Sequence, residues 1–109
     1  MTDRLFVYGT LAPGRPNEHV LKDVAGTWAP GVVRGDLTQR GWGAGLGYPA
    51  LVLRSDGPDV PGLVFTSDAL ADLWSELDRF EGPEYARVTV SVALDTGAAV
   101  LAFVYVAKG

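Results

Sequence analysis

The chain has 109 residues, about the length of one domain, and its composition of 48% hydrophobic and 20% charged residues favours a folded core over disorder. The formal net charge of -4 argues against nucleic acid or an anionic membrane surface as a partner. The absence of Cys excludes disulfides, thiolate nucleophiles and Cys-ligated zinc. No apolar run reaches the length of a signal peptide or a membrane span. We therefore expect a single soluble domain over residues 1–109, located in the cytoplasm.

The first half of the chain is expected to consist mainly of strands and loops. Residues 5–8 form a short apolar run typical of a buried strand, and a loop follows to Pro16. Asn17 can cap a short helix that ends at Val24. Residues 28–38 predict an irregular strand, in which glycines indicate a bulge or a tight bend. The glycine-dense residues 39–49 predict a loop that can approach a ligand closely.

The later strands are expected to form two hairpins. Residues 50–53 and 62–65 are short strand candidates on either side of a cluster of turn residues. Residues 88–94 alternate between apolar and polar side chains, and residues 98–106 follow the turn Asp95-Thr96-Gly97. About six strands and two short helices predict an α+β fold with a mixed or antiparallel sheet, curled into a small barrel.

A single amphipathic helix is predicted after Ser67, which can act as its N-cap. Its apolar stripe consists of Leu70, Leu73, Trp74 and Leu77. Glu81 falls within about 20° of Leu70 on the helical wheel, so this carboxylate is in line with the core stripe.

Two interpretations of Glu81 are open at this point. The helix can fray before Gly82-Pro83, in which case Glu81 turns into water as an ordinary helix-end acid. Alternatively, Glu81 lies at the edge of the core and is partly desolvated, which raises its proton affinity and makes it a usable general acid or base.

Few other residues indicate chemistry. The segment Tyr8-Gly9-Thr10-Leu11 leads from a strand into a loop whose backbone N–H groups can bind a small anion, although a plain turn is an equally simple interpretation. His19 is the only histidine and has no second ligand at metal-binding spacing, so no metal site is predicted. Arg87 can pair with an acid, bind a substrate carboxylate or point into solvent from a strand face.

Taken together, these segments resemble the γ-glutamylcyclotransferase-like superfamily, including its small AIG2-like members. The resemblance rests on Tyr8-Gly9-Thr10-Leu11, on Gly47-Tyr48-Pro49-Ala50 and on Leu77-Asp78-Arg79-Phe80-Glu81-Gly82 followed by Tyr85 and Arg87. It implies a small mixed barrel of five to six strands. It also implies that the protein releases 5-oxoproline from γ-glutamyl compounds, because the α-amine of the substrate attacks its own γ-carbonyl.

The resemblance also implies roles for individual residues. Glu81 matches the catalytic acid of the family, and Tyr8, Gly9, Thr10 and Leu11 match its substrate loop. Further candidates for lining the pocket are Tyr48, Tyr85, Arg87 and Tyr105. The reaction requires no cofactor and no protein nucleophile.

The substrate loop has the shorter form Tyr-Gly-Thr-Leu, which leaves the leaving group open between an amino acid and another amine, such as the ε-amine of lysine. The alternative function is a non-catalytic module that binds a small carboxylate metabolite in the same pocket, and a weaker one is a structural partner protein. The sequence predicts no oligomeric state.

Overall fold

The computed structural model describes residues 3–8, 21, 24–38, 50–82 and 85–107. In chain order the described elements are β1 (Asp3–Val7), β2 (Thr27–Thr38), β3 (Ala50–Leu53), β4 (Asp59–Ser67), the 3-10 helix η2 (Asp68–Asp72), α2 (Trp74–Glu81), β5 (Tyr85–Leu94) and β6 (Ala99–Ala107).

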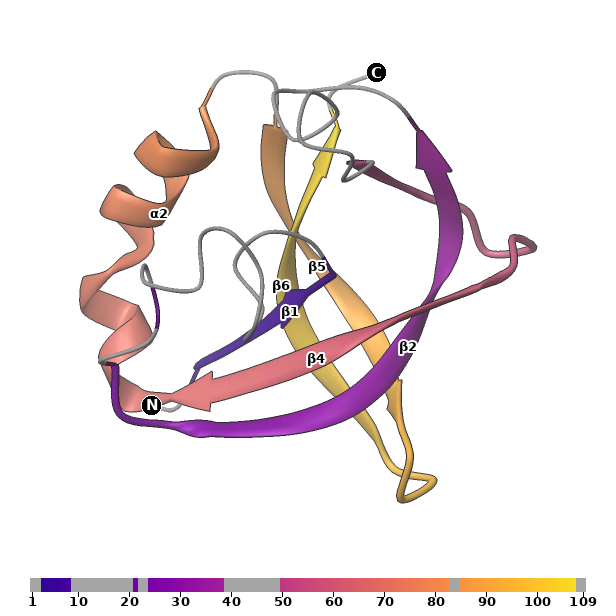
Figure 1. The fold of residues 1–109 in the computed structure, drawn as a ribbon, viewed down its shortest axis with the longest axis horizontal. Helices are drawn as coiled ribbons and strands as arrows, with labels where there is room; N and C mark the ends of the chain where they lie inside the picture. Colours follow the sequence, from indigo (N-terminus) through magenta and orange to yellow (C-terminus); the bar gives the residue numbers. More distant parts are fainter. Residues whose placement is uncertain (1–2, 9–20, 22–23, 39–49, 83–84, 108–109) are drawn as a thin grey trace.

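Five of the six strands close into a barrel, as Figure 1 shows. The strand order is β3-β2-β4-β1-β6-β5, and β2 also pairs with β5 through Gly31↔Leu94 and Val32↔Ala93. Strands β1 and β6 run parallel, whereas the other neighbouring strands are antiparallel. The structure therefore confirms the predicted α+β fold with a small mixed barrel.

The strands separate two apolar layers because successive side chains point to opposite faces. In β1, Phe6 belongs to the cluster inside the barrel, whereas Leu5 and Val7 belong to the cluster between the barrel and the helices. The inner cluster also contains Val33, Leu51, Val60, Val64, Val92, Ala102 and Val104. The outer cluster also contains Leu21, Phe65, Leu70, Leu77 and Tyr105. The helices thus cover one side of the barrel (Figure 1).

The β5–β6 hairpin matches its prediction. Strand register runs from Tyr85↔Ala107 to Ala93↔Ala99. The turn is closed by the N–H of Leu94 bonding to the carbonyl of Ala98 at 2.8 Å, and Gly97 adopts φ 92°, a conformation that favours glycine.

The other predicted hairpin is wrong, because β3 and β4 do not pair with each other. Both pair with β2, but on opposite edges, because the strand order places β2 between them: Leu53 lies opposite Gly35, and Asp59 lies opposite Arg34. Residues 54–58 therefore carry the chain across β2 from one edge to the other. The crossing passes β2 at Gly35, where a Cβ atom on Gly57 would lie 3.1 Å from backbone atoms of Gly35. The turn residues were identified correctly, but they lead the chain across a third strand rather than reversing its direction.

Strand β2 bends, as its glycines predicted, and Figure 1 shows it curving around the barrel. At Gly31, where β2 pairs with both β4 and β5, a Cβ atom would lie 2.7 Å from the side chain of Val92. Glycine therefore permits the close approach that closes the barrel.

The predicted helix after Ser67 is two pieces rather than one. Ser67 caps η2, since its hydroxyl accepts the N–H of Ala69 at 3.1 Å. The backbone then changes from 3-10 to α geometry at Leu73, which has φ -109° and ψ -10°. Element η2 contacts β1, whereas α2 contacts β5. Because these strands are separated by β6 in a twisted sheet, one straight helix cannot follow both.

The predicted loops over residues 9–16 and 39–49 lie outside the described residues. So does the predicted helix over residues 18–24 with its cap Asn17, except for Leu21, which is buried in the outer cluster, and Val24, which packs against that cluster. Among the described residues, no helix is both long and apolar enough to cross a membrane.

Candidate functional site

Four of the predicted site residues gather where several elements begin or end at one end of the barrel. Tyr8 follows β1, Glu81 is the last residue of α2, Tyr85 is the first residue of β5, and Tyr105 lies near the end of β6. Burial is the largest cause that raises the pKa of Tyr8 and Tyr105; the charge of Glu81 adds to both shifts and Tyr85 adds to that of Tyr8, so these side chains lie near one another. Residues separated by up to 97 positions are therefore brought together.

Glu81 is held at the boundary between the apolar layer and water. Helix α2 ends directly after it, because Gly82 adopts φ 85° and its N–H bonds to the carbonyl of Asp78 at 3.0 Å. Burial raises the pKa of Glu81 from 4.5 to about 7. Glu81 is thus partly desolvated, as its place on the apolar stripe predicted, and both of its protonation states are populated near neutral pH.

Tyr8 ties three strands together through its hydroxyl group. The hydroxyl donates to the carbonyl of Tyr105 in β6 at 2.7 Å and accepts the N–H of Leu51 in β3 at 2.9 Å. Burial is the main reason that the pKa of Tyr8 lies above its ordinary range, so the phenol stays protonated. Tyr8 therefore fixes the point at which the predicted substrate loop leaves β1.

The next three residues of the predicted loop, Gly9, Thr10 and Leu11, lie outside the described residues, as does Tyr48. The structure consequently brings Tyr8, Glu81, Tyr85 and Tyr105 together and gives no position for the other loop residues.

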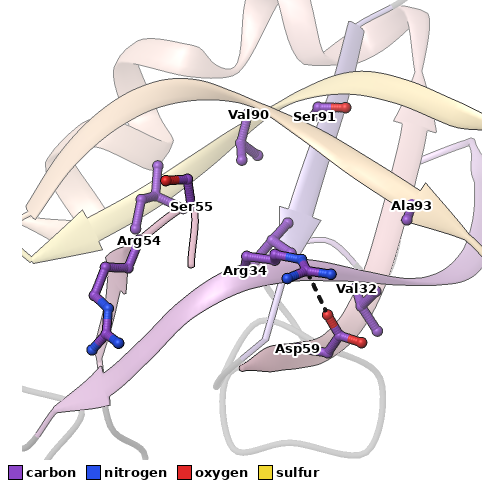
Figure 2. A pocket seen from close by; sticks show the side chains of 10 residues that line it. Val32, Arg34, Arg54, Ser55, Asp59, Val90, Ser91 and Ala93 are labelled. Atoms are coloured by element: carbon purple, nitrogen blue, oxygen red, sulfur yellow. Dashed lines mark ion pairs between the residues drawn. The ribbon is translucent and has the colours of Figure 1, made fainter. Parts of the chain in front are cut away.

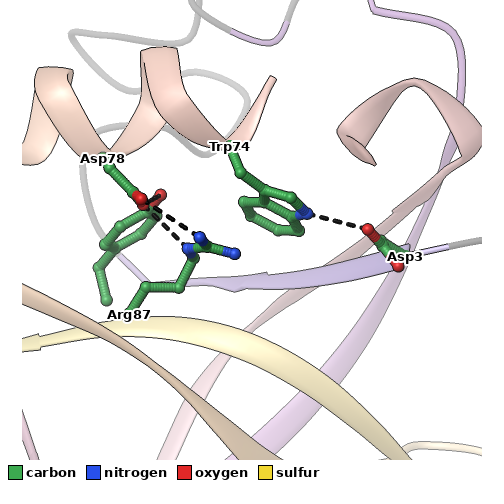
Figure 3. Close-up of polar contacts among 5 residues, drawn as sticks. Asp3, Trp74, Asp78 and Arg87 are labelled. Atoms are coloured by element: carbon green, nitrogen blue, oxygen red, sulfur yellow. Dashed lines mark hydrogen bonds and ion pairs between the residues drawn. The ribbon is translucent and has the colours of Figure 1, made fainter. Parts of the chain in front are cut away.

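Arg87 forms an ion pair, which is one of the three possibilities that its sequence position left open. Its Nε and Nη2 atoms donate to the two carboxylate oxygens of Asp78 at 2.9 and 3.2 Å (Figure 3). The guanidinium also lies over the rings of Trp74, at 4.6 Å, and Phe103, at 5.1 Å. The interpretation of Arg87 as a free strand-face charge in solvent is therefore wrong.

Asp78 was not predicted to take part in the site, although it lies in the same helical turn as Glu81. The hydroxyl of Tyr105 donates to the Oδ1 atom of Asp78 at 2.6 Å, which with Arg87 holds the pKa of this carboxyl below its usual range. Two sequence features point to this contact: Asp78 is three residues before Glu81 on the helix, and Tyr105 lies opposite Arg87 in the β5–β6 register. Figure 3 shows the neighbouring bond from the indole of Trp74 to Asp3, at 2.9 Å.

A separate hollow of about 580 Å³ lies between β2, β3 and β5 (Figure 2). Its lining includes the apolar Val33 and Val90 and also Arg34 and Asp59, which form an ion pair with 3.8 Å from Nε to Oδ1. None of the predicted site residues that the structure describes lines this hollow. Volume alone therefore does not identify the site, and the desolvated acid is the stronger indication of chemistry. Among the described residues, no group of three or more His, Asp or Glu side chains could hold a metal ion.

Solved structures share this fold. YkqA from Bacillus subtilis is 29% identical with a TM-score of 0.76, and the match covers 99% of this chain and 36% of that one. An AIG2-like protein from Mus musculus is 24% identical with a TM-score of 0.75, covering 98% of this chain and 78% of that one. A protein from Arabidopsis thaliana is 32% identical with a TM-score of 0.71, covering 98% of this chain and 62% of that one. The chain thus spans about a third of YkqA.

No curated protein matches the chain. A family model described as gamma-glutamyl cyclotransferase, AIG2-like, matches residues 5–109, which include every predicted site residue. On the strength of this match, the chain belongs to the AIG2-like gamma-glutamyl cyclotransferase family.

Proposed function

We propose that this single domain is a cofactor-free cyclotransferase that releases 5-oxoproline from a γ-glutamyl amine or γ-glutamyl amino acid. The observation that carries the proposal is Glu81, a partly buried acid with a pKa of about 7. The motif resemblance in the sequence assigns the catalytic acid of the family to this position, which lies within the matched residues 5–109. The partner is therefore a small γ-glutamyl molecule. We place the reaction in the cytoplasm, because a chain without Cys suits a reducing compartment.

In this reaction the substrate supplies its own nucleophile. The Glu81 carboxylate takes a proton from the α-ammonium group, and the resulting amine attacks the γ-carbonyl carbon to form the ring C–N bond. The bond from that carbon to the leaving nitrogen then breaks, and protonated Glu81 donates to the leaving nitrogen. Overall, the ammonium nitrogen gives up two protons and keeps one as the lactam N–H. Glu81 carries the first proton to the leaving nitrogen; after the ring bond has formed, it takes the second from the ring nitrogen and passes it to the departing amine, which leaves as an ammonium ion. Glu81 ends as a carboxylate.

The remaining contribution of the protein is to hold the substrate in a reactive conformation. Intramolecular attack is fast when the amine is kept against the carbonyl, and this positioning supplies much of the acceleration. We assign the grip on the α-carboxylate to the backbone N–H groups of Gly9, Thr10 and Leu11, which follow the anchored Tyr8. Tyr48 and Tyr85 are assigned to the pocket wall.

The test is the release of 5-oxoproline, measured by mass spectrometry, from γ-glutamyl amino acids, γ-glutamyl alkylamines and γ-glutamyl-ε-lysine. Glu81→Gln is compared with Glu76→Gln, which removes an exposed carboxylate from the same helix. We expect turnover in wild type and Glu76→Gln and a loss of about 100-fold or more in Glu81→Gln. Substrates acetylated on the α-amine should not react.

Two results would change the proposal. Full turnover by Glu81→Gln would reject Glu81 as the acid/base. Absence of 5-oxoproline from every substrate would favour the module that binds a small carboxylate, and a thermal shift with glutamate or 5-oxoproline would then test that function.

A further inference from the structure

We propose that Asp78 is a positioning residue: held by Tyr105 and Arg87, it fixes the last turn of α2 and thereby the position and hydration of Glu81. The proposal rests on the proposed function in one respect only, since the benefit to catalysis requires Glu81 to be the acid/base. The geometric claim can be measured without any substrate.

The first step is that α2 requires external contacts to hold its orientation. The helix has eight residues, and helices of this length are marginal without tertiary packing. Leu77 is buried in the outer cluster, Trp74 and Phe80 pack against that cluster, and the indole of Trp74 also donates to Asp3. These contacts hold the apolar face of the helix, and a polar anchor on the neighbouring face adds a restraint in the turn that carries Glu81.

Asp78 supplies this polar anchor on the neighbouring face. At about 100° per residue, Glu81 lies about 40° from Leu77 and about 60° from Asp78, between the two. Contacts to both neighbours therefore restrict rotation of the Glu81 side chain toward water in one direction and toward the core in the other.

The contact at Asp78 is stronger than an ordinary surface ion pair. Arg87 binds both carboxylate oxygens, Tyr105 adds a third hydrogen bond at 2.6 Å, and two aromatic rings cover the guanidinium. The Arg87 side chain is 26% exposed, compared with 54% for Arg54 in its pair with Asp36, whereas the two acids are similarly exposed, Asp78 at 45% and Asp36 at 42%. The better shielded guanidinium and the additional bond from Tyr105 therefore make the Asp78 contact the more restrained of the two.

Tyr105 connects this anchor to the substrate loop. Its hydroxyl donates to Asp78, whereas its backbone carbonyl accepts the hydroxyl of Tyr8. One residue of β6 thus determines where the helix carrying the acid lies and where the loop after Tyr8 begins. The relative position of the proposed base and the proposed carboxylate grip therefore depends on Tyr105 at both ends.

The anchor also persists while Glu81 gains and loses its proton. The described charged or titratable groups that face this region are Asp78 on α2, Arg87 and Tyr85 on β5, Tyr105 on β6 and Tyr8 after β1. The pKa of Asp78 is lowered and those of Tyr8 and Tyr105 are raised. These three keep their charge states near neutral pH, so the contact does not open when Glu81 titrates.

The test compares Asp78→Ala, Asp78→Asn and Tyr105→Phe with wild type. Tyr105→Phe removes the hydroxyl and leaves the carbonyl that Tyr8 requires. Asp36→Asn is the matched control, because it weakens an exposed ion pair with Arg54 that shares no residue with the Asp78 contact. The main measurement is the titration of the Glu81 carboxyl carbon by NMR in each folded variant, and kcat, KM and Tm are recorded beside it.

We expect the pKa of Glu81 to fall from about 7 by one unit or more in Asp78→Ala and Tyr105→Phe, because the acid becomes hydrated. With an active substrate, kcat should fall by roughly 10- to 100-fold while KM changes little. Asp78→Asn retains one carbonyl oxygen for Tyr105, so its Glu81 pKa and its kcat should fall less than those of Asp78→Ala. Asp36→Asn should match wild type.

Each outcome decides the proposal. If Tm falls but the Glu81 titration and kcat do not change, Asp78 is purely structural and the proposal is overturned. If Asp78→Ala does not fold, the Glu81 titration and kcat of Tyr105→Phe test the same claim. If wild type releases no 5-oxoproline while the variants still lower the Glu81 pKa, the positioning stands and the proposed reaction fails.

Discussion

Replacing Glu81 with Gln should make the protein more stable at neutral and alkaline pH. The folded pKa of about 7 lies above the unfolded value of 4.5, so the folded state binds the proton more tightly. The stabilisation that the folded state gains by binding this proton more tightly is fully present below pH 4.5 and is lost as the pH rises through 7. The carboxylate form is therefore the destabilising one, and Gln resembles the neutral acid in size and hydrogen bonding.

The size of this destabilisation follows from the pKa shift of Glu81. A change from 4.5 to about 7 corresponds to about 3 kcal/mol of destabilisation once Glu81 is fully ionised. At pH 5 only about 1 kcal/mol of this is present, because the unfolded state is only partly ionised there. We thus expect Glu81→Gln to exceed wild type by about 1 kcal/mol at pH 5 and about 3 kcal/mol at pH 8.5.

Urea denaturation at half-unit intervals from pH 5 to 9 measures this difference. Subtracting the free energy of unfolding of the variant from that of wild type cancels the contributions of all other titrating groups. Glu76→Gln, at an exposed position of α2, should give a difference that is flat with pH. A flat difference for Glu81→Gln as well would refute the reasoning, since it would mean that ionised Glu81 is well hydrated in the folded protein.

Three further predictions concern activity and packing. The pH profile of kcat/KM should rise with a midpoint near 7, because the Glu81 carboxylate must accept the ammonium proton; a midpoint near 4.5 would exclude a desolvated base. Ser67→Ala removes the acceptor for the Ala69 N–H and the donor to the Ala25 carbonyl, and it should lower the free energy of unfolding by about 1–2 kcal/mol in urea titrations. Gly62→Ala places a Cβ atom 2.5 Å from both the Phe6 ring and the Val7 carbonyl. Thermal denaturation should therefore show a free energy of unfolding that is lower by about 3 kcal/mol. An unchanged Tm would mean that β1 and β4 can separate slightly.

Local patterns predicted the parts of the fold that depend on neighbouring residues. The alternation in residues 88–94 and the turn at Gly97 give the β5–β6 hairpin, because both strands and their connection are contiguous in the chain. The stripe that ends at Glu81 predicted partial burial of this acid, since helical periodicity alone sets its direction.

Pairings between distant segments were not predictable in the same way. The turn residues between β3 and β4 are compatible with a hairpin and with a crossing over a third strand, and only the pairing of the two segments with opposite edges of β2 distinguishes these possibilities. Likewise, Asp78 is one of several acids on its helix. Its role depends on Tyr105, which is 27 residues away and is brought near by the β5–β6 register.

The burial of Glu81 links the stability and the chemistry of this site. An acid with a pKa near 4.5 would be ionised at neutral pH, but it would be a weak base and almost never protonated for the return step to the leaving amine. Raising the pKa to about 7 populates both forms and makes the carboxylate more basic, at a cost of about 3 kcal/mol in folding when ionised. That cost favours any motion of α2 that exposes Glu81 to water. An anchor such as the Asp78 contact with Arg87 and Tyr105 opposes this motion, and it is therefore expected beside the acid rather than elsewhere on the barrel.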